Sequence, residues 1–264
     1  NYGFRAYILL REEVYRATQG KIDFFQTPKF VRIARYGKKI QMNEGVCPAY
    51  SDCRMGLSPD KFILSYCDRA LGITSAEEQP VLPKGNNLSL HLLELFTSQV
   101  AKVGMTDGIR QVLQEESDAL RAYYEQAGIL IARPAGETSC RLAISAKGGT
   151  NAENHNHNDV GSYAVALGSE TMVGDQGGPN SYPGDYFNGD APQKYKIKGS
   201  FGHPVPVVNG RTQSSGGKAK GVVLQKEFTN EKDVFSIDYT SAYSTPNLDK
   251  LIRTFVYDRQ GKGS

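Results

Sequence analysis

Residues 154–177 read NHNHNDVGSYAVALGSETMVGDQG, and this stretch holds the densest group of chemically active side chains in the sequence. His155, His157 and Asp159 alternate near its start, and Asp175 lies near its end. Three of the four histidines of the chain fall between positions 155 and 203. Imidazole can ligate a transition metal or exchange protons near neutral pH. The stretch therefore predicts a metal site or an acid–base site, with chance clustering as the alternative.

Length and charge bound the possible functions. The chain has 264 residues and a formal net charge of +3, enough for one large or two ordinary domains with a modestly basic surface. Its basic residues are scattered, which argues against nucleic acid as a partner. No apolar run reaches bilayer length, so no membrane span is predicted. Free thiols are the default for its cysteines, although Cys47 and Cys53 could pair in an oxidising compartment.

The first part of the chain, residues 1–126, is predicted to be helical. Apolar residues recur at helical spacing from Phe4 to Tyr15. Thr27-Pro28 and Ser58-Pro59 each place a capping hydroxyl before a proline, which is typical of a helix start. Two more helices are expected over residues 88–103 and 108–126.

The second part, residues 127–264, changes to short β-type runs separated by Gly, Asn, Asp and Ser. The candidate strands are residues 129–132, 141–146, 162–167, 205–208, 222–228, 234–239 and 251–257. Helices followed by strands predict an α+β protein of separate layers or domains rather than an alternating α/β fold. Seven short strands with turn signals favour an antiparallel sandwich.

The histidine cluster admits three assignments. Residues two apart in a strand face the same way, so His155, His157 and Asp159 would project together unless a turn splays them. In one assignment His157, Asp175 and His203 bind a metal and leave His155 for catalysis. In another, His157, Asp159 and His203 form the iron-binding face of a non-haem oxygenase. In the third, these side chains only satisfy one another in a polar loop.

Residues 154–177 resemble the signature of the heparinase II/III-like polysaccharide lyases, in which an H-x-H-x-D-x-G-S/T-F/Y run enters a strand and a second strand ends in Asp-x-Gly. The likeness continues from Gly202 to Gly210, where Pro204 and Asn209 depart from the family pattern. The segment from Tyr7 to Gly20 resembles the family helix that opens with a catalytic tyrosine.

The resemblance implies an incomplete (α/α) toroid followed by an antiparallel β-sandwich, with the active site in the cleft between them. It places His157, Asp175 and His203 on the ligand positions of a structural zinc, or another divalent metal. It places His155 on the catalytic histidine and Tyr7 on the catalytic tyrosine. We expect the sequence to be a truncated fragment, because the family's uronate-neutralising residues lie upstream of the tyrosine helix.

The activity that the resemblance implies is β-elimination on an acidic, uronate-containing polysaccharide, in the periplasm or outside a bacterial cell. Tyr7 would protonate the leaving oxygen and could also take the proton from C5. His155 would act as the base for the opposite C5 epimer or as a partner of the carboxylate. Candidate substrate-binding residues are Asn154, Arg54, Tyr182 and Tyr186; Phe187 lies in the same aromatic loop as the two tyrosines. A non-catalytic sugar-binding module is the further alternative.

Overall fold

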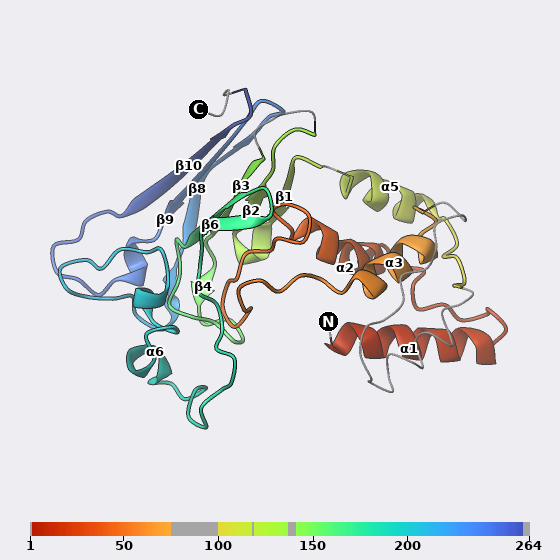
Figure 1. Ribbon diagram of the computed structural model, residues 1–264, viewed down its shortest axis with the longest axis horizontal. Coiled ribbons are helices and arrows are strands. Elements are labelled where there is room, and N and C mark those ends of the chain that lie inside the picture. The colour runs from red at the N-terminus through yellow and green to blue at the C-terminus, as the bar shows by residue number, and fades with distance from the viewer. Residues whose placement is uncertain (1, 75–99, 118, 137–140, 261–264) are drawn as a thin grey trace. The chain divides into compact units, whose positions relative to one another are not determined.

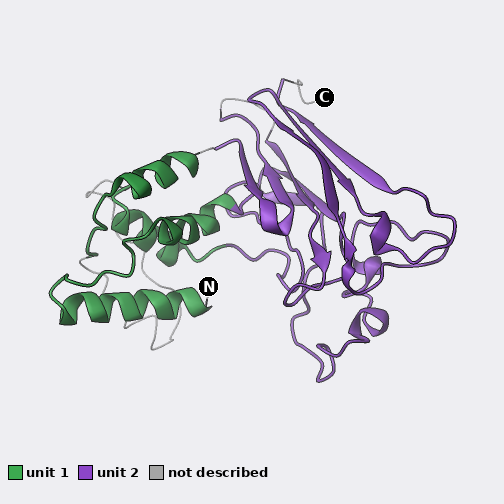
Figure 2. Ribbon diagram, turned by 180° about the vertical axis from the view of Figure 1, so that it is seen from behind, with its two compact units in different colours: residues 1–39, 59–118 green, residues 40–58, 119–264 purple. Residues whose placement is uncertain are grey.

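The structure is a computed structural model that describes residues 2–74, 100–117, 119–136 and 141–260. The chain forms two compact units (Figure 2): unit 1 comprises Asn1–Lys39 and Pro59–Asp118, and unit 2 comprises Ile40–Ser58 and Ala119–Ser264. The division differs from the predicted boundary at residue 126, because residues 40–58 and 119–126 belong to the second unit. The α+β class is confirmed, since helices dominate the first unit and antiparallel strands the second.

Unit 1 contains four described α-helices (Figure 1): α1 (Tyr2–Ala17), α2 (Pro28–Lys39), α3 (Lys61–Ala70) and α5 (Asp107–Glu115). The predicted cap of α2 is confirmed, because the Thr27 hydroxyl accepts from the Phe30 amide at 3.2 Å. The predicted cap of α3 is wrong. Asp60 replaces Ser58 there, and its carboxylate accepts from the Phe62 amide at 2.9 Å. The helix starts two residues after Pro59, where this acidic side chain reaches the free amides of the first turn.

An aromatic core holds the helices of unit 1 together. The Phe25 and Phe30 rings stack with centroids 3.6 Å apart, and Tyr66 meets Phe25 edge-on. Ile8 and Val31 are fully buried in the same cluster. Most residues of this core come from α1, α2, α3 and α5, where they recur at helical spacing.

Two helix predictions differ from the structure. The helix expected over residues 108–126 ends at Glu115, and residues 121–124 instead form strand β1. The helix expected over residues 88–103 falls mostly outside the described residues, and its described end, residues 100–103, is not helical.

Unit 2 is built on a five-stranded antiparallel sheet of order β1-β2-β3-β5-β6. Its strands are β1 (Arg121–Tyr124), β2 (Ile129–Ala132), β3 (Leu142–Lys147), β5 (Tyr163–Leu167) and β6 (Glu170–Val173). A three-stranded sheet of order β10-β9-β8 contains β8 (Val222–Phe228), β9 (Lys232–Asp238) and β10 (Ile252–Asp258). The short strands β4 (Thr150–Asn151) and β7 (Gly216–Lys220) pair with each other.

The five-stranded sheet is covered on both faces. On one face, Leu130 and Ala146 pack against Phe235 of the three-stranded sheet. On the other face, Ile131 packs against Met42 and its neighbours from residues 40–58. Alternate residues of a strand point to opposite faces, which explains how adjacent Leu130 and Ile131 serve different cores. This packing attaches residues 40–58 to unit 2.

The remaining elements are short: α6 (Ala191–Lys194) and the 3₁₀ helices η1 (Glu125–Ala127), η2 (Ser200–Gly202) and η3 (Thr240–Ala242). The strand predicted over residues 205–208 is wrong, since only an isolated bridge joins Val208 to Arg211. Pro204 precedes this segment and Pro206 lies within it, and neither can donate to a ladder. Within the described ranges, no helix combines the length and apolarity that crossing a bilayer requires. Cys47, Cys53 and Cys67 are free thiols, and Cys140 lies outside the described residues.

Candidate functional site

The histidine motif lies in a turn between β4 and β5 rather than in a strand. His155 adopts a left-handed backbone conformation, with φ of 59°. As a result the two histidines separate: the His155 side chain is 63% exposed, whereas His157 is fully buried. The expected projection of His155, His157 and Asp159 from one face is therefore wrong. A non-glycine residue in this conformation carries some strain, and such residues cluster at functional sites.

Asp52 joins the two histidines. Its Oδ2 lies 2.7 Å from Nδ1 of His155, and its Oδ1 lies 3.0 Å from Nε2 of His157. The Tyr186 hydroxyl also donates to Oδ1, at 3.1 Å. The Asp52 side chain is only 8% exposed, so one nearly buried carboxylate contacts an exposed imidazole on one side and a buried imidazole and phenol on the other.

Two glycines allow the backbone of Asp52 to approach the loop after β6. A Cβ built on Gly177 would lie 1.8 Å from the Cys53 carbonyl oxygen, and one on Gly178 would lie 2.5 Å from the Asp52 carbonyl oxygen. Gly177 also has a positive φ of 65°. The Gly178 amide donates to the Cys53 carbonyl at 3.3 Å. Only residues without a side chain permit this contact.

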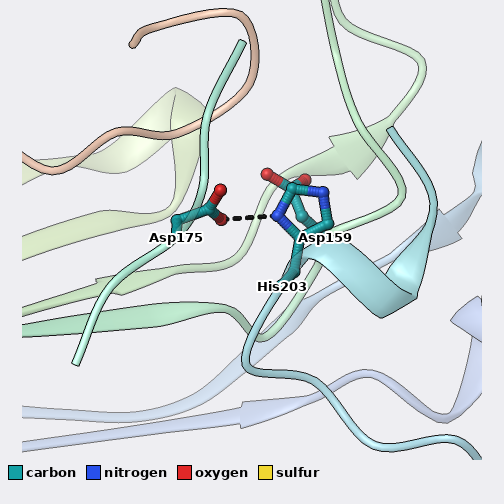
Figure 3. Close-up of side chains that lie close together, drawn as sticks. All are labelled: Asp159, Asp175 and His203. Carbon is teal, nitrogen blue, oxygen red and sulfur yellow. Dashed lines mark hydrogen bonds and ion pairs between the residues drawn. The ribbon is translucent and has the colours of Figure 1, made fainter. Parts of the chain in front are cut away.

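A buried group of two carboxylates and one imidazole lies next to the histidine turn. The candidate ligand atoms of Asp159, Asp175 and His203 all lie within 4.8 Å of one another. Figure 3 shows the Asp175 carboxylate directed at His203, whose Nδ1 lies 2.7 Å from Oδ2. Asp175 also accepts from the Ser162 hydroxyl at 2.9 Å. Asp159 forms an ion pair with the buried ammonium of Lys147.

The donor atoms of this group suit a divalent metal ion. Among the described residues, Asp159 Oδ2, His203 Nε2 and His157 Nδ1 are buried atoms without a hydrogen-bond partner. Orphaned buried polar atoms are costly, and a cation that accepts their lone pairs would remove that cost. The pKa of His157 is lowered, mainly by burial, and this favours the neutral ring that metals bind.

The compact group differs in one member from the ligand set predicted by the resemblance. It contains Asp159 with Asp175 and His203, whereas the prediction named His157 with the latter two. His157 is nevertheless a neighbour, because its ring centroid lies 5.1 Å from that of His203. Sequence spacing placed all four side chains in one region and did not rank them as ligands.

An aromatic shelf, defined here as Tyr182, Tyr186 and Phe187, lies beside His155. The Phe187 ring is 53% exposed and meets the His155 ring edge-on, with centroids 5.3 Å apart. Tyr182 is 43% exposed, and its ring centroid lies 5.1 Å from that of Phe187. Tyr186 is fully buried beneath them, with the Lys198 ammonium 4.4 Å from its ring centroid. Tyr186 therefore supports the shelf, and its ring has no free face for a sugar.

The other predicted site residues have separate settings. Arg54 donates to the Asn180 carbonyl at 2.8 Å, which ties it to the loop that carries the shelf. Asn154 is exposed next to His155. Tyr7 belongs to unit 1, where its hydroxyl donates to the Phe24 carbonyl at 2.8 Å. Burial, followed by the charge of Asp23, raises the pKa of Tyr7 and keeps the phenol protonated.

Solved structures of heparinases have a similar fold. Heparan sulfate lyase HepC from Pedobacter heparinus matches with a TM-score of 0.55 and 13% identity, over 97% of this chain and 36% of that one. A structure titled heparinase III matches with a TM-score of 0.53 and 15% identity, over 97% of this chain and 37% of that one. The BT4657 gene product, a heparinase III with methylated lysines, matches with a TM-score of 0.54 and 11% identity, over 97% of this chain and 35% of that one.

This likeness shows a heparinase-type fold, and the chain spans about a third of the length of the lyases it matches. No protein-family model and no curated protein matches the sequence. The expected family resemblance is thus supported through the fold, at a level of identity where sequence comparison finds no match.

Proposed function

We propose that the protein is a polysaccharide lyase that cleaves uronate-containing acidic polysaccharides by β-elimination. The observation that carries the proposal is the pairing of exposed His155 with nearly buried Asp52, beside the aromatic shelf. The heparinase-type fold supports this reading, because the named solved structures are lyases of this kind. We propose that the protein acts in the periplasm or outside a bacterial cell, where such polysaccharides would be degraded.

His155 is the proposed base. Its Nδ1 is engaged by Asp52, so its Nε2 is the nitrogen available to take the C5 proton of a uronate. As that proton leaves, negative charge develops on the uronate carboxylate and must be stabilised by nearby donors. The bond between C4 and its oxygen then breaks, which gives an unsaturated sugar and a free hydroxyl on the departing chain.

Tyr7 is the proposed acid for the departing C4 oxygen. Its raised pKa supports this role, because the phenol keeps its proton until a more basic alkoxide forms. To act, the hydroxyl must exchange its hydrogen bond with the Phe24 carbonyl for one to substrate.

The buried group supports the turn that carries His155. We propose His157, Asp175 and His203 as metal ligands, with Asp159 as a candidate fourth ligand that completes the set. A bound divalent ion, such as zinc, would supply a structural cross-link between loops rather than chemistry on the substrate. This role agrees with the burial of all four side chains, which a polymer cannot reach.

Phe187 and Tyr182 are the proposed sugar-stacking residues, because both rings are exposed next to His155. Exposed aromatic faces bind the apolar faces of sugar rings, and their position beside the base would place a uronate within reach of Nε2. Asn154 and Arg54 would contact hydroxyl or acidic groups of the polymer.

The two alternatives find less support. A non-haem iron site of His157, Asp159 and His203 would leave Asp175 remote from the iron, yet Oδ2 of Asp175 lies 2.7 Å from Nδ1 of His203. A sugar-binding module would explain the aromatic shelf but not the pairing of an exposed imidazole with a carboxylate.

The test is the ultraviolet absorbance of unsaturated uronate after the protein is mixed with heparan sulfate, hyaluronan, chondroitin sulfate or alginate. We expect absorbance to rise with at least one polymer, and His155→Gln to abolish the rise. Asp190→Asn, an exposed change in the same loop region, serves as the control and should leave the rate unchanged. No rise with any polymer, or full activity in His155→Gln, would contradict the proposal.

A further inference from the structure

We propose that Asp52 is a positioning residue that fixes both the orientation and the tautomer of His155 and of His157. The inference rests on the proposed function only for its kinetic consequence. Its structural content concerns one carboxylate and the two imidazoles that touch it, and can be tested without any substrate.

The first step concerns His155. Its ring is largely exposed, and the described contacts that hold it are the Phe187 edge and the Asp52 carboxylate. An ionised carboxylate only accepts hydrogen bonds, so Nδ1 of His155 must carry the proton when it pairs with Oδ2. In the neutral ring, Nε2 is then the unprotonated nitrogen. Without Asp52, the described contact with Phe187 would be left to orient the exposed ring, and nothing in that contact would select one tautomer.

The second step concerns His157. Its Nε2 lies 3.0 Å from Asp52 Oδ1 and 3.1 Å from the Tyr186 hydroxyl, which itself donates to the same carboxylate oxygen. By the same rule, Nε2 carries the proton and Nδ1 presents a lone pair. Nδ1 is the buried atom of this ring without a partner. The carboxylate that prepares one imidazole as a base thus prepares the other as a metal ligand.

The third step predicts the effect of an amide at position 52. Asp52→Asn keeps the shape of the side chain but offers one oxygen and one NH₂ group. Oδ1 meets two donors, from His157 and Tyr186, whereas Oδ2 meets one, from His155. The amide oxygen should therefore take the Oδ1 position and turn its NH₂ toward His155. The His155 proton must then move to Nε2, and the base is lost.

The test reads the tautomers directly by ¹⁵N-detected NMR of the histidine rings in mildly alkaline buffer, with His155→Gln and His157→Gln used for assignment. In the wild type we expect both tautomers described above. In Asp52→Asn, His155 should carry its proton on Nε2 while His157 keeps its tautomer. Asp185→Asn is the matched control, because this nearby carboxylate pairs with Lys194 and Tyr195 instead. Unchanged His155 tautomer in Asp52→Asn would overturn the proposal.

Kinetics add an independent readout. We expect kcat of Asp52→Asn to fall by about 10²- to 10⁴-fold, the usual contribution of a positioned acid or base, with KM changed by less than about threefold. Formate added to Asp52→Ala should restore part of kcat, since it can replace the missing carboxylate. Wild-type kcat in Asp52→Asn would also overturn the proposal. A wild type inactive on every polymer would contradict the proposed function, while the NMR result would still decide the role of Asp52.

Discussion

Lys147→Met should destabilise unit 2, because it leaves the buried carboxylate of Asp159 without its cation. Lys147 ends β3, its side chain is 1% exposed, and its ammonium pairs with Asp159, which is fully buried. Methionine nearly matches the length of lysine but carries no charge. Asp159 would then face the interior without its cation, and one of its oxygens already lacks a partner among the described residues.

The expected loss is about 3–5 kcal/mol of unfolding free energy, the usual cost of removing one partner of a buried ion pair. Lys147→Met/Asp159→Asn should recover most of it, because the unpaired charge is gone. Urea unfolding followed by circular dichroism provides the measurement, since the chain has no tryptophan to report by fluorescence. A chelator keeps metal out of every sample, so that binding does not add to stability.

Lys194→Met is the matched control, because it removes an ammonium from a solvent-exposed pair with Asp185. Exposed pairs contribute little, so its unfolding midpoint should stay close to that of the wild type. The reasoning would be refuted if Lys147→Met unfolded at the same urea concentration as this control. It would also be refuted if the double variant were no more stable than Lys147→Met.

Three further predictions concern the metal, the shelf and alkaline stability. Asp175→Asn should lower the affinity for Zn²⁺ by more than about 100-fold, because losing an outer-shell partner of a ligand alone costs about 10- to 100-fold. Competition with a chelating dye measures the affinity, and an unchanged value would exclude Asp175 as a ligand. Phe187→Ala should raise KM by roughly two- to tenfold at constant kcat, from an aromatic contact of about 0.5–1.5 kcal/mol; an unchanged KM in initial-rate assays would remove Phe187 from the sugar site. Burial raises the pKa of Tyr243 to about 12, so the folded state keeps a proton that the unfolded state loses above pH about 10. The free energy of unfolding should therefore fall as pH rises from about 10 to about 12, by up to about 2–3 kcal/mol from this residue. Urea unfolding should show a smaller fall in Tyr243→Phe, and an equally steep fall in that variant would contradict the raised pKa of Tyr243.

Local patterns predicted most of the elements. Strand β2 has the predicted bounds, Ile129–Ala132, and β8 has the predicted bounds, Val222–Phe228, because each is a short run of β-type residues that begins directly after a glycine. Strand β1 was missed because Arg121–Tyr124 continues a helical pattern, and its β conformation depends on pairing with β2. Such pairing is a tertiary effect that propensity does not contain.

The candidate site was predicted in part. The spacing of histidines and carboxylates brought His157, Asp159, Asp175 and His203 to attention, and the structure places them in one buried region. Asp52 carried no signal, because it lies 103 positions before His155 and is an ordinary acidic residue in a turn. The sequence allowed for a turn that splays His155 and His157 but did not fix it, since the separation depends on a left-handed residue within a polar turn.

The glycines at 177 and 178 have a consequence for how the chain tolerates mutation. Neither can bond to a substrate or a metal through a side chain, yet any side chain there would collide with the main chain at Cys53 or Asp52. The collision would displace the segment that contains Asp52 and so misalign the His155 and His157 rings. In a saturation mutagenesis scan, substitutions of Gly177 and Gly178 would then reduce function as severely as substitutions of the two histidines. A search for functional residues that considers only reactive side chains would overlook both glycines.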